Sequence, residues 1–115
     1  MTAHSVDKHF DGKLPVVRET YDMVLHVARR FGNVAEDPKK TSIHLVARTA
    51  FVGVTTRQAK LVLTIKSPVA VKGRRVAKCE QLSANRWHFE LHVNTPADID
   101  SDFEAWLRRA YEISA

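Results

Sequence analysis

Three ionisable residues alternate with apolar ones along one predicted strand. His88, Glu90 and His92 stand between the apolar residues of segment 87–93, so their side chains share one face. Imidazole and carboxylate groups on one face are the donors of a metal site. His88 and His92 would lie about 13 Å apart by strand rise, so only neighbours such as His88 and Glu90 can share an ion. A sheet with one solvated face also needs polar residues here, and this simpler interpretation is favoured.

A small acid–base site is the enzymatic alternative. His44, on the polar side of an earlier predicted strand, joins His88 and Glu90 as its candidate residues. Such a site needs hydrogen-bond reach between its members, which spacing along the chain does not reveal. The sequence holds no G-x-S-x-G, H-E-x-x-H, Walker or glycine-rich fingerprint. We expect no metal and no cofactor, and we leave open whether the chain is an enzyme.

Basic residues concentrate in one segment of the chain. Residues 57–86 hold eight Lys and Arg against one acid, Glu80, which gives +7, whereas the whole chain carries +5. Such a surface attracts anionic ligands, nucleic acid or acidic proteins. The candidate anion-binding residues are Lys40, Lys60, Lys66, Lys72, Arg74, Arg75 and Lys78. Lys40 could instead pair with the acidic connector at Glu36 and Asp37, and this interpretation is favoured. Aromatic residues that would stack on bases, Phe51 among them, fall instead on predicted core faces.

Hydrophobic periodicity predicts one helix near each end of the chain. Apolar residues recur three and four positions apart from Leu14 to Phe31, with Pro15 in the first turn. A second apolar stripe runs from Ile99 to Tyr111, and Thr95 before Pro96 is the expected cap. Residues 1–12 lack periodicity and are expected to be flexible. The length of 115 residues is typical of a single domain, residues 1–115.

The residues between the helices predict an antiparallel meander sheet of four or five strands. The expected strands are 42–48, 51–56, 60–66, 76–82 and 87–93, and residues 33–40 are expected to form a polar connector. Because the strands alternate apolar and polar residues, we predict a two-layer α+β fold in which the N-terminal and C-terminal helices cover one face.

The uncovered face of this sheet is a second candidate surface. It is expected to be open to water and partly apolar, since the valines expected to point outward are Val46, Val52, Val54 and Val62. A partly apolar exposed face suits a partner protein or a homodimer formed through the sheet.

Cysteine content and hydropathy bear on location. Cys79 is the single cysteine, so no intramolecular disulfide is possible. The N-terminal residues lack the apolar stretch of a secretory signal, and no segment approaches the roughly 20 apolar residues of a membrane span. We therefore expect a cytoplasmic protein without membrane association.

Residues spread along the chain carry a resemblance to a known family. They are His9-Phe10-Asp11-Gly12, Val17-Arg18, Tyr21, Lys40-Thr41-Ser42-Ile43, Phe51, Leu61-Val62-Leu63, Trp87-His88-Phe89, and Trp106-Leu107 with Ala110-Tyr111. With these residues the chain resembles bacterial domain-of-unknown-function family 5655 over nearly its whole length. The resemblance implies relatives that occur alone or at the C-terminal end of bacterial proteins labelled predicted transport proteins. It implies no catalytic motif.

Two classes of function remain open. The leading hypothesis is a non-enzymatic binding module for an anionic ligand or a partner protein, because the +7 segment accompanies an uncovered sheet face. The alternative is a small enzyme or metal site built on His44, His88 and Glu90.

Overall fold

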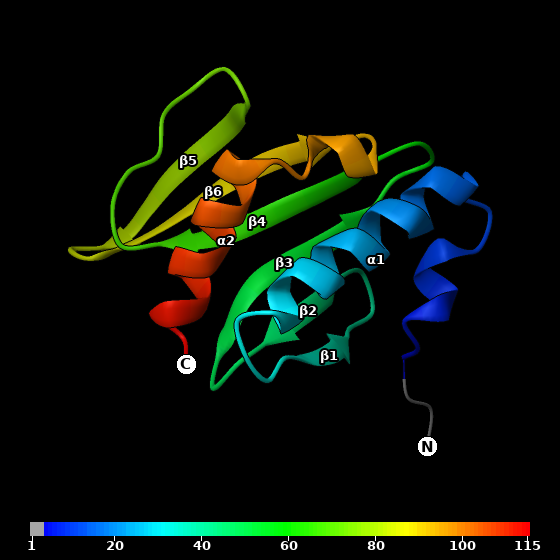
Figure 1. Cartoon of the computed structure of the whole chain (residues 1–115), viewed down its shortest axis with the longest axis horizontal. Coiled ribbons are helices and arrows are strands. Elements are labelled where there is room, and N and C mark those ends of the chain that lie inside the picture. The colour runs from blue at the N-terminus through cyan, green and yellow to red at the C-terminus, as the bar shows by residue number, and fades with distance from the viewer. Residues whose placement is uncertain (1–3) are drawn as a thin grey trace.

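The computed structural model describes residues 4–115 (Figure 1). A 3-10 helix, η1 (Asp7–Phe10), precedes helix α1 (Pro15–Arg29). The strands that follow are β1 (Ala35–Pro38), β2 (Ile43–Val46), β3 (Ala50–Thr56), β4 (Leu61–Ser67), β5 (Val76–Ser83) and β6 (Arg86–Val93). The described chain ends with the 3-10 helix η2 (Pro96–Asp98) and helix α2 (Ser101–Glu112). None of the described helices is long and apolar enough to cross a membrane.

The strands form one antiparallel sheet in the order β1-β2-β3-β4-β6-β5. The predicted α+β class is confirmed, but the expected count of four or five strands is wrong, because the sheet has six. The meander also breaks after β4, which pairs with β6, so that β5 lies at the edge. The added strand is β1, expected to be a connector. It is short and ends at Pro38, which an edge strand tolerates because one side of its backbone needs no partner.

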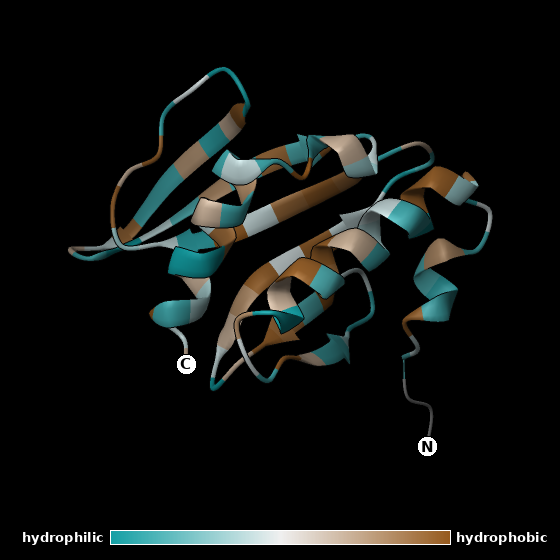
Figure 2. Ribbon diagram, viewed as in Figure 1, coloured by the Kyte–Doolittle hydropathy of each residue, from teal (hydrophilic) through white to brown (hydrophobic). Residues whose placement is uncertain are grey.

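Both helices cover the same face of the sheet (Figure 1). Val17 and Tyr21 of α1 and Phe103 and Leu107 of α2 are fully buried. Figure 2 shows that the central strands beneath them are the most apolar part of the chain, while each helix also carries hydrophilic residues. Burial of each of these four helix side chains contributes roughly 1.5–3 kcal/mol to the free energy of unfolding. Burial of these apolar stripes therefore fixes the two layers and leaves the other sheet face uncovered.

A β-bulge in β3 changes which residues point toward the helices. Leu45 lies opposite Val52, but Val46 lies opposite Ala50, so Phe51 is an extra residue in β3. The expectation that Val52 points outward is wrong, and so is the same expectation for Val54. Phe51, Val52 and Val54 are all buried in the core. Phe51 meets Tyr111 of α2 edge-on, with 5.6 Å between ring centroids. The uncovered face is therefore less apolar than its sequence indicates.

The last helix begins later than expected, because this segment has two caps. Thr95 and Asp98 form a capping box, but on the short helix η2. Ile99 leaves helical geometry, and Asp100 then caps α2 by accepting a hydrogen bond from the backbone N–H of Phe103 at 3.0 Å. Helix α2 consequently starts at Ser101.

Candidate anion-binding site

One row of residues crosses four strands on the uncovered sheet face, and most of its members are polar. His44, Gly53, Thr64 and Glu90 lie side by side across β2, β3, β4 and β6. Neighbouring strands are about 4.8 Å apart, so this row spans about 14 Å. Lys66 lies opposite His88, two residues from Thr64 on β4 and two residues from Glu90 on β6. The pattern of alternation thus placed His44 and His88 on the correct face.

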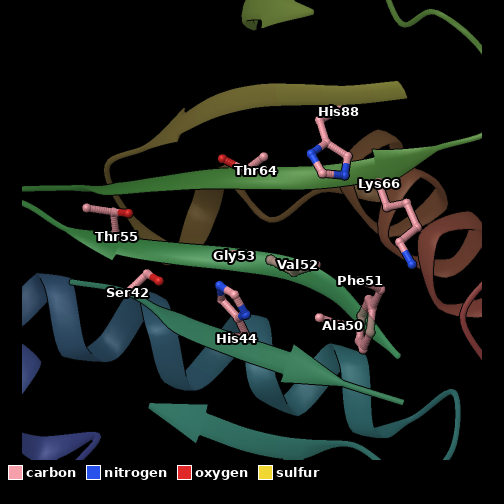
Figure 3. A pocket seen from close by; sticks show the side chains of 10 residues that line it. All are labelled: Ser42, His44, Ala50, Phe51, Val52, Gly53, Thr55, Thr64, Lys66 and His88. Atoms are coloured by element: carbon pink, nitrogen blue, oxygen red, sulfur yellow. The ribbon is translucent and has the colours of Figure 1, made fainter. Parts of the chain in front are cut away.

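A hollow of about 320 Å³ lies on this face over Gly53. The hollow forms there because Gly53 has no side chain, whereas its neighbours His44 and Thr64 on the adjacent strands do. The polar residues that line it are Ser42, His44, Thr55, Thr64, Lys66 and His88. Figure 3 shows the imidazoles of His44 and His88 leaning inward from β2 and β6, and the Lys66 amine reaching across from β4. No carboxylate is among the residues that line the hollow.

Lys66 is a buried cation in this hollow. The residue is 9% exposed, and its Nζ donates a hydrogen bond to Thr49 Oγ1 at 3.2 Å. Within residues 4–115, no carboxylate lies within ion-pair distance of its amine. Burial lowers the pKa of Lys66, and the nearby charge of Arg86 lowers this pKa further. Buried charges are normally paired, so an anion in the hollow would compensate this one.

His88 lies near the positive charges of Lys66 and Arg86. Burial is the main cause that lowers the pKa of His88, followed by the charges of Lys66 and Arg86. Glu80 on β5 opposes this shift only in part. The imidazole is therefore mostly neutral at neutral pH, and a neutral imidazole has one nitrogen that donates and one that accepts.

Glu90, the carboxylate of the alternative site, lies outside the hollow. Its Oε1 is 3.6 Å from His92 Nε2, and Lys60 Nζ is 2.9 Å from His92 Nδ1. The carboxylate of Glu90 therefore lies beside His92 of the same strand rather than beside His88. Among residues 4–115, no group of three His, Cys, Asp or Glu side chains is arranged to hold a metal ion.

The other basic candidates are dispersed over the molecule. Arg75 points to the helix side, where its Nη1 contacts both Asp100 carboxylate oxygens at 2.9 and 3.0 Å, and its guanidinium stacks on Trp106. The candidates exposed in loops or on the edge strand are Lys40, Lys72, Arg74 and Lys78. Asp37 of the acidic connector pairs with Lys39 at 2.9 Å. Of the seven predicted anion-binding residues, the structure places Lys66 in the hollow.

Several residues of the hollow escaped the sequence-based reasoning. Gly53 forms its floor, and hydroxyl groups of Ser42, Thr55 and Thr64 stand around it. A glycine in the interior of a strand marks close approach of another group, and this was the available signal. The hydroxyl residues carry no such signal, because threonine is common in any half-exposed strand.

Comparison with known proteins gives one match. The model of a family described as "Domain of unknown function (DUF5655)" matches residues 6–114. No curated protein and no solved structure matches the chain. The family match agrees with the resemblance carried by residues spread along the sequence.

Proposed function

Since the chain belongs to the family of domains of unknown function DUF5655, whose description names no activity, we propose from the hollow itself that this protein is a binding module for a small anionic ligand. The observation that carries the proposal is Lys66, a largely buried lysine that borders the hollow without an acidic partner within ion-pair distance among the described residues.

The surroundings of Lys66 suit an anion for three reasons. Hydrogen bonds from a charged donor are about twice as strong as neutral ones, and the partly desolvated setting strengthens them further. His44 and His88 add ring nitrogens, and the nearby Ser and Thr residues add hydroxyl donors. Gly53 leaves the room that a ligand needs.

Nuclear magnetic resonance titration tests the proposal. Uniformly ¹⁵N-labelled protein is titrated at constant ionic strength with inorganic phosphate and with citrate. We expect at least one probe to shift the amide signals of Gly53, Thr64 and Lys66. The variant Lys66→Met, which keeps the length and apolar body of the side chain, should lose this binding.

A matched control separates the hollow from general positive charge. Lys78 lies on the same sheet face, but at the exposed edge strand β5, outside the hollow. Lys78→Met should therefore bind both probes as the wild type does. Equal binding by Lys66→Met, or shifts confined to the basic loop 68–75, would contradict the proposal.

One observation favours a second candidate function, acid–base catalysis. His44 and His88 line the same hollow, and the lowered pKa of His88 leaves a neutral base at neutral pH. Neither ring has a carboxylate in the hollow to orient it. A catalytic role predicts product formation from a bound compound that His44→Gln and His88→Gln each abolish while binding persists. Unchanged turnover in either variant would eliminate this candidate.

We also propose that the protein acts in the bacterial cytoplasm. The family resemblance supports a bacterial source, and a single cysteine, Cys79, suits a reducing compartment. Dispersed basic residues outside the hollow would then attract anions at long range. Fractionation of source cells checks this location.

A further inference from the structure

Lys66 borders two hollows, one on the uncovered face and one where the end of the chain meets the turn between β2 and β3. The second hollow has a volume of about 440 Å³, and Lys66 borders it together with Arg48, Thr49, Arg86, Ile113, Ser114 and Ala115. Lys66 thereby joins the hydroxyl-rich hollow over Gly53 to a hollow dominated by arginine. Both volumes fall within the range of roughly 300–1,000 Å³ typical of small-molecule sites.

Three cationic side chains line this second hollow. Neither Arg48 nor Arg86 pairs with a carboxylate among the described residues, whereas Arg18 and Arg75 each do. Arg86 also lies near enough to Lys66 and His88 to lower the pKa of both. Two arginines and one lysine therefore line one hollow, and an anion bound there would reduce the repulsion between their charges.

Two hydroxyl groups in the same hollow have protons to donate. Thr49 accepts a hydrogen bond from Lys66, which leaves its own O–H free. Ser114 is 3% exposed, and its Oγ is the buried side-chain polar atom without a partner among residues 4–115. The Ser114 carbonyl links the end of the chain to the turn between β2 and β3, since it accepts hydrogen bonds from the backbone N–H groups of Arg48 at 2.9 Å and Thr49 at 3.0 Å. Thr49 can therefore donate to a ligand in the hollow, whereas the enclosed Ser114 hydroxyl would reach one only after its side chain turns.

We propose that this second hollow is a phosphate subsite, and that the ligand is a phosphate monoester whose uncharged, hydroxylated body lies over Gly53. This inference rests on the proposed anion-binding function and specifies its ligand class. A phosphate monoester carries up to two negative charges on three terminal oxygens, which suits Lys66 and the planar forks of Arg48 and Arg86.

The body of the ligand follows from the first hollow. Its Ser42, Thr55 and Thr64 hydroxyls and the His44 imidazole are partners for neutral hydroxyl and amide-like groups rather than for a second strong charge. Gly53 adds no side chain to this hollow, which leaves room for the body of a ligand. A nucleoside and a sugar both have this chemistry.

Matched pairs of probes test the phosphate subsite by calorimetric titration at constant ionic strength. The pairs are AMP with adenosine and ribose 5-phosphate with ribose, and citrate serves as an anion without phosphate. We expect the phosphorylated member of at least one pair to bind about tenfold or more tightly than its partner and than citrate. The pair with the larger effect identifies a nucleoside or a sugar as the body.

Substitutions locate the effect. Arg48→Gln and Arg86→Gln should each weaken the phosphorylated probe about tenfold, because each removes charge-assisted hydrogen bonds. The control Arg74→Gln removes an exposed charge of the same basic segment outside both hollows and should change affinity less than about twofold. Thermal melts check that all three variants fold.

The outcomes separate the two proposals. If both members of each pair bind equally and Arg48→Gln has no effect, while Lys66→Met still abolishes citrate binding, the phosphate subsite is wrong and the anion-binding function stands. If no probe binds, both are wrong. If a single-stranded oligonucleotide binds far more tightly than any monomer, with affinity that grows with length and falls with salt, the small-ligand inference is overturned in favour of nucleic acid.

Discussion

Replacing Gly53 by valine fills the floor of the candidate site, and the sheet has room for the change. A Cβ atom at this position would meet His44 Cδ2 at 3.8 Å and Thr64 Cβ at 3.9 Å, which are ordinary van der Waals contacts. Gly53 is not among the glycines with positive φ, so its backbone does not require glycine. Alanine should therefore fit without straining β3, and the two further methyl carbons of valine would extend into the hollow.

The effect on stability can be worked out from the backbone. Glycine in a strand interior is about 0.5–1 kcal/mol less stable than alanine. Unfolding entropy of roughly 2.1 cal/mol/K per residue gives about 0.24 kcal/mol/K for a chain of this length. Gly53→Ala should thus raise Tm by about 2–4 °C, and Gly53→Val by at least as much, because β-branched residues favour strands.

Binding should respond in the opposite direction. The valine methyl groups take the space over the floor between His44 and Thr64, so Gly53→Val should bind any ligand that extends over Gly53 at least about tenfold more weakly, a loss of about 1.4 kcal/mol. Gly53→Ala, which adds one methyl group, should lose less.

Thermal melts by circular dichroism and titration with the best-binding anion give the two readouts on the same preparations. A Tm lowered by several degrees in Gly53→Ala would refute the argument that the strand has room for a side chain. Wild-type affinity in a well-folded Gly53→Val would refute the placement of the ligand over this residue.

Three further predictions address His88 and the packing of the helices. Because the pKa of His88 is lowered in the folded state, the unfolded chain takes up its proton first as pH falls, so stability should decline from about pH 6.5 down to the lowered pKa; denaturant melts across pH should lose this decline in His88→Gln. Tyr21→Phe removes a 2.5 Å hydrogen bond from its hydroxyl to Glu36 Oε2, which joins α1 to β1, and should cost about 1–3 kcal/mol in urea unfolding. Gly32→Ala would bring a Cβ into collision with the Tyr111 hydroxyl and should cost about 1–3 kcal/mol; the double variant with Tyr111→Phe should recover part of that loss, and no recovery would contradict the collision.

The local pattern of residue types was sufficient for much of the fold. Pro15 and the three-and-four spacing that follows it determine α1, because an amphipathic stripe and a first-turn proline act within the helix itself. Strict alternation from Trp87 to Val93 likewise determines which side of β6 is buried. These elements were predictable because neighbouring residues along the chain carry the whole signal.

The assembly of the hollow depended on contacts between distant segments. Residue pattern does not reveal that β4 pairs with β6, or that Phe51 is an extra residue which turns Val52 and Val54 toward the helices. A bulge shifts every following side chain to the other face, so one inserted residue outweighs the local pattern.

The sequence by itself determined the class of fold, the two helices and the polar side of β6, because each depends on periodicity within one segment. Only the tertiary structure decided that His44, Lys66 and His88 line the hollow over Gly53, and that Lys66 is buried with no described carboxylate within ion-pair distance. The physical reason is register: which side chains meet across a sheet is set by how separate strands align under the packing of the core, and that alignment is a property of the whole chain.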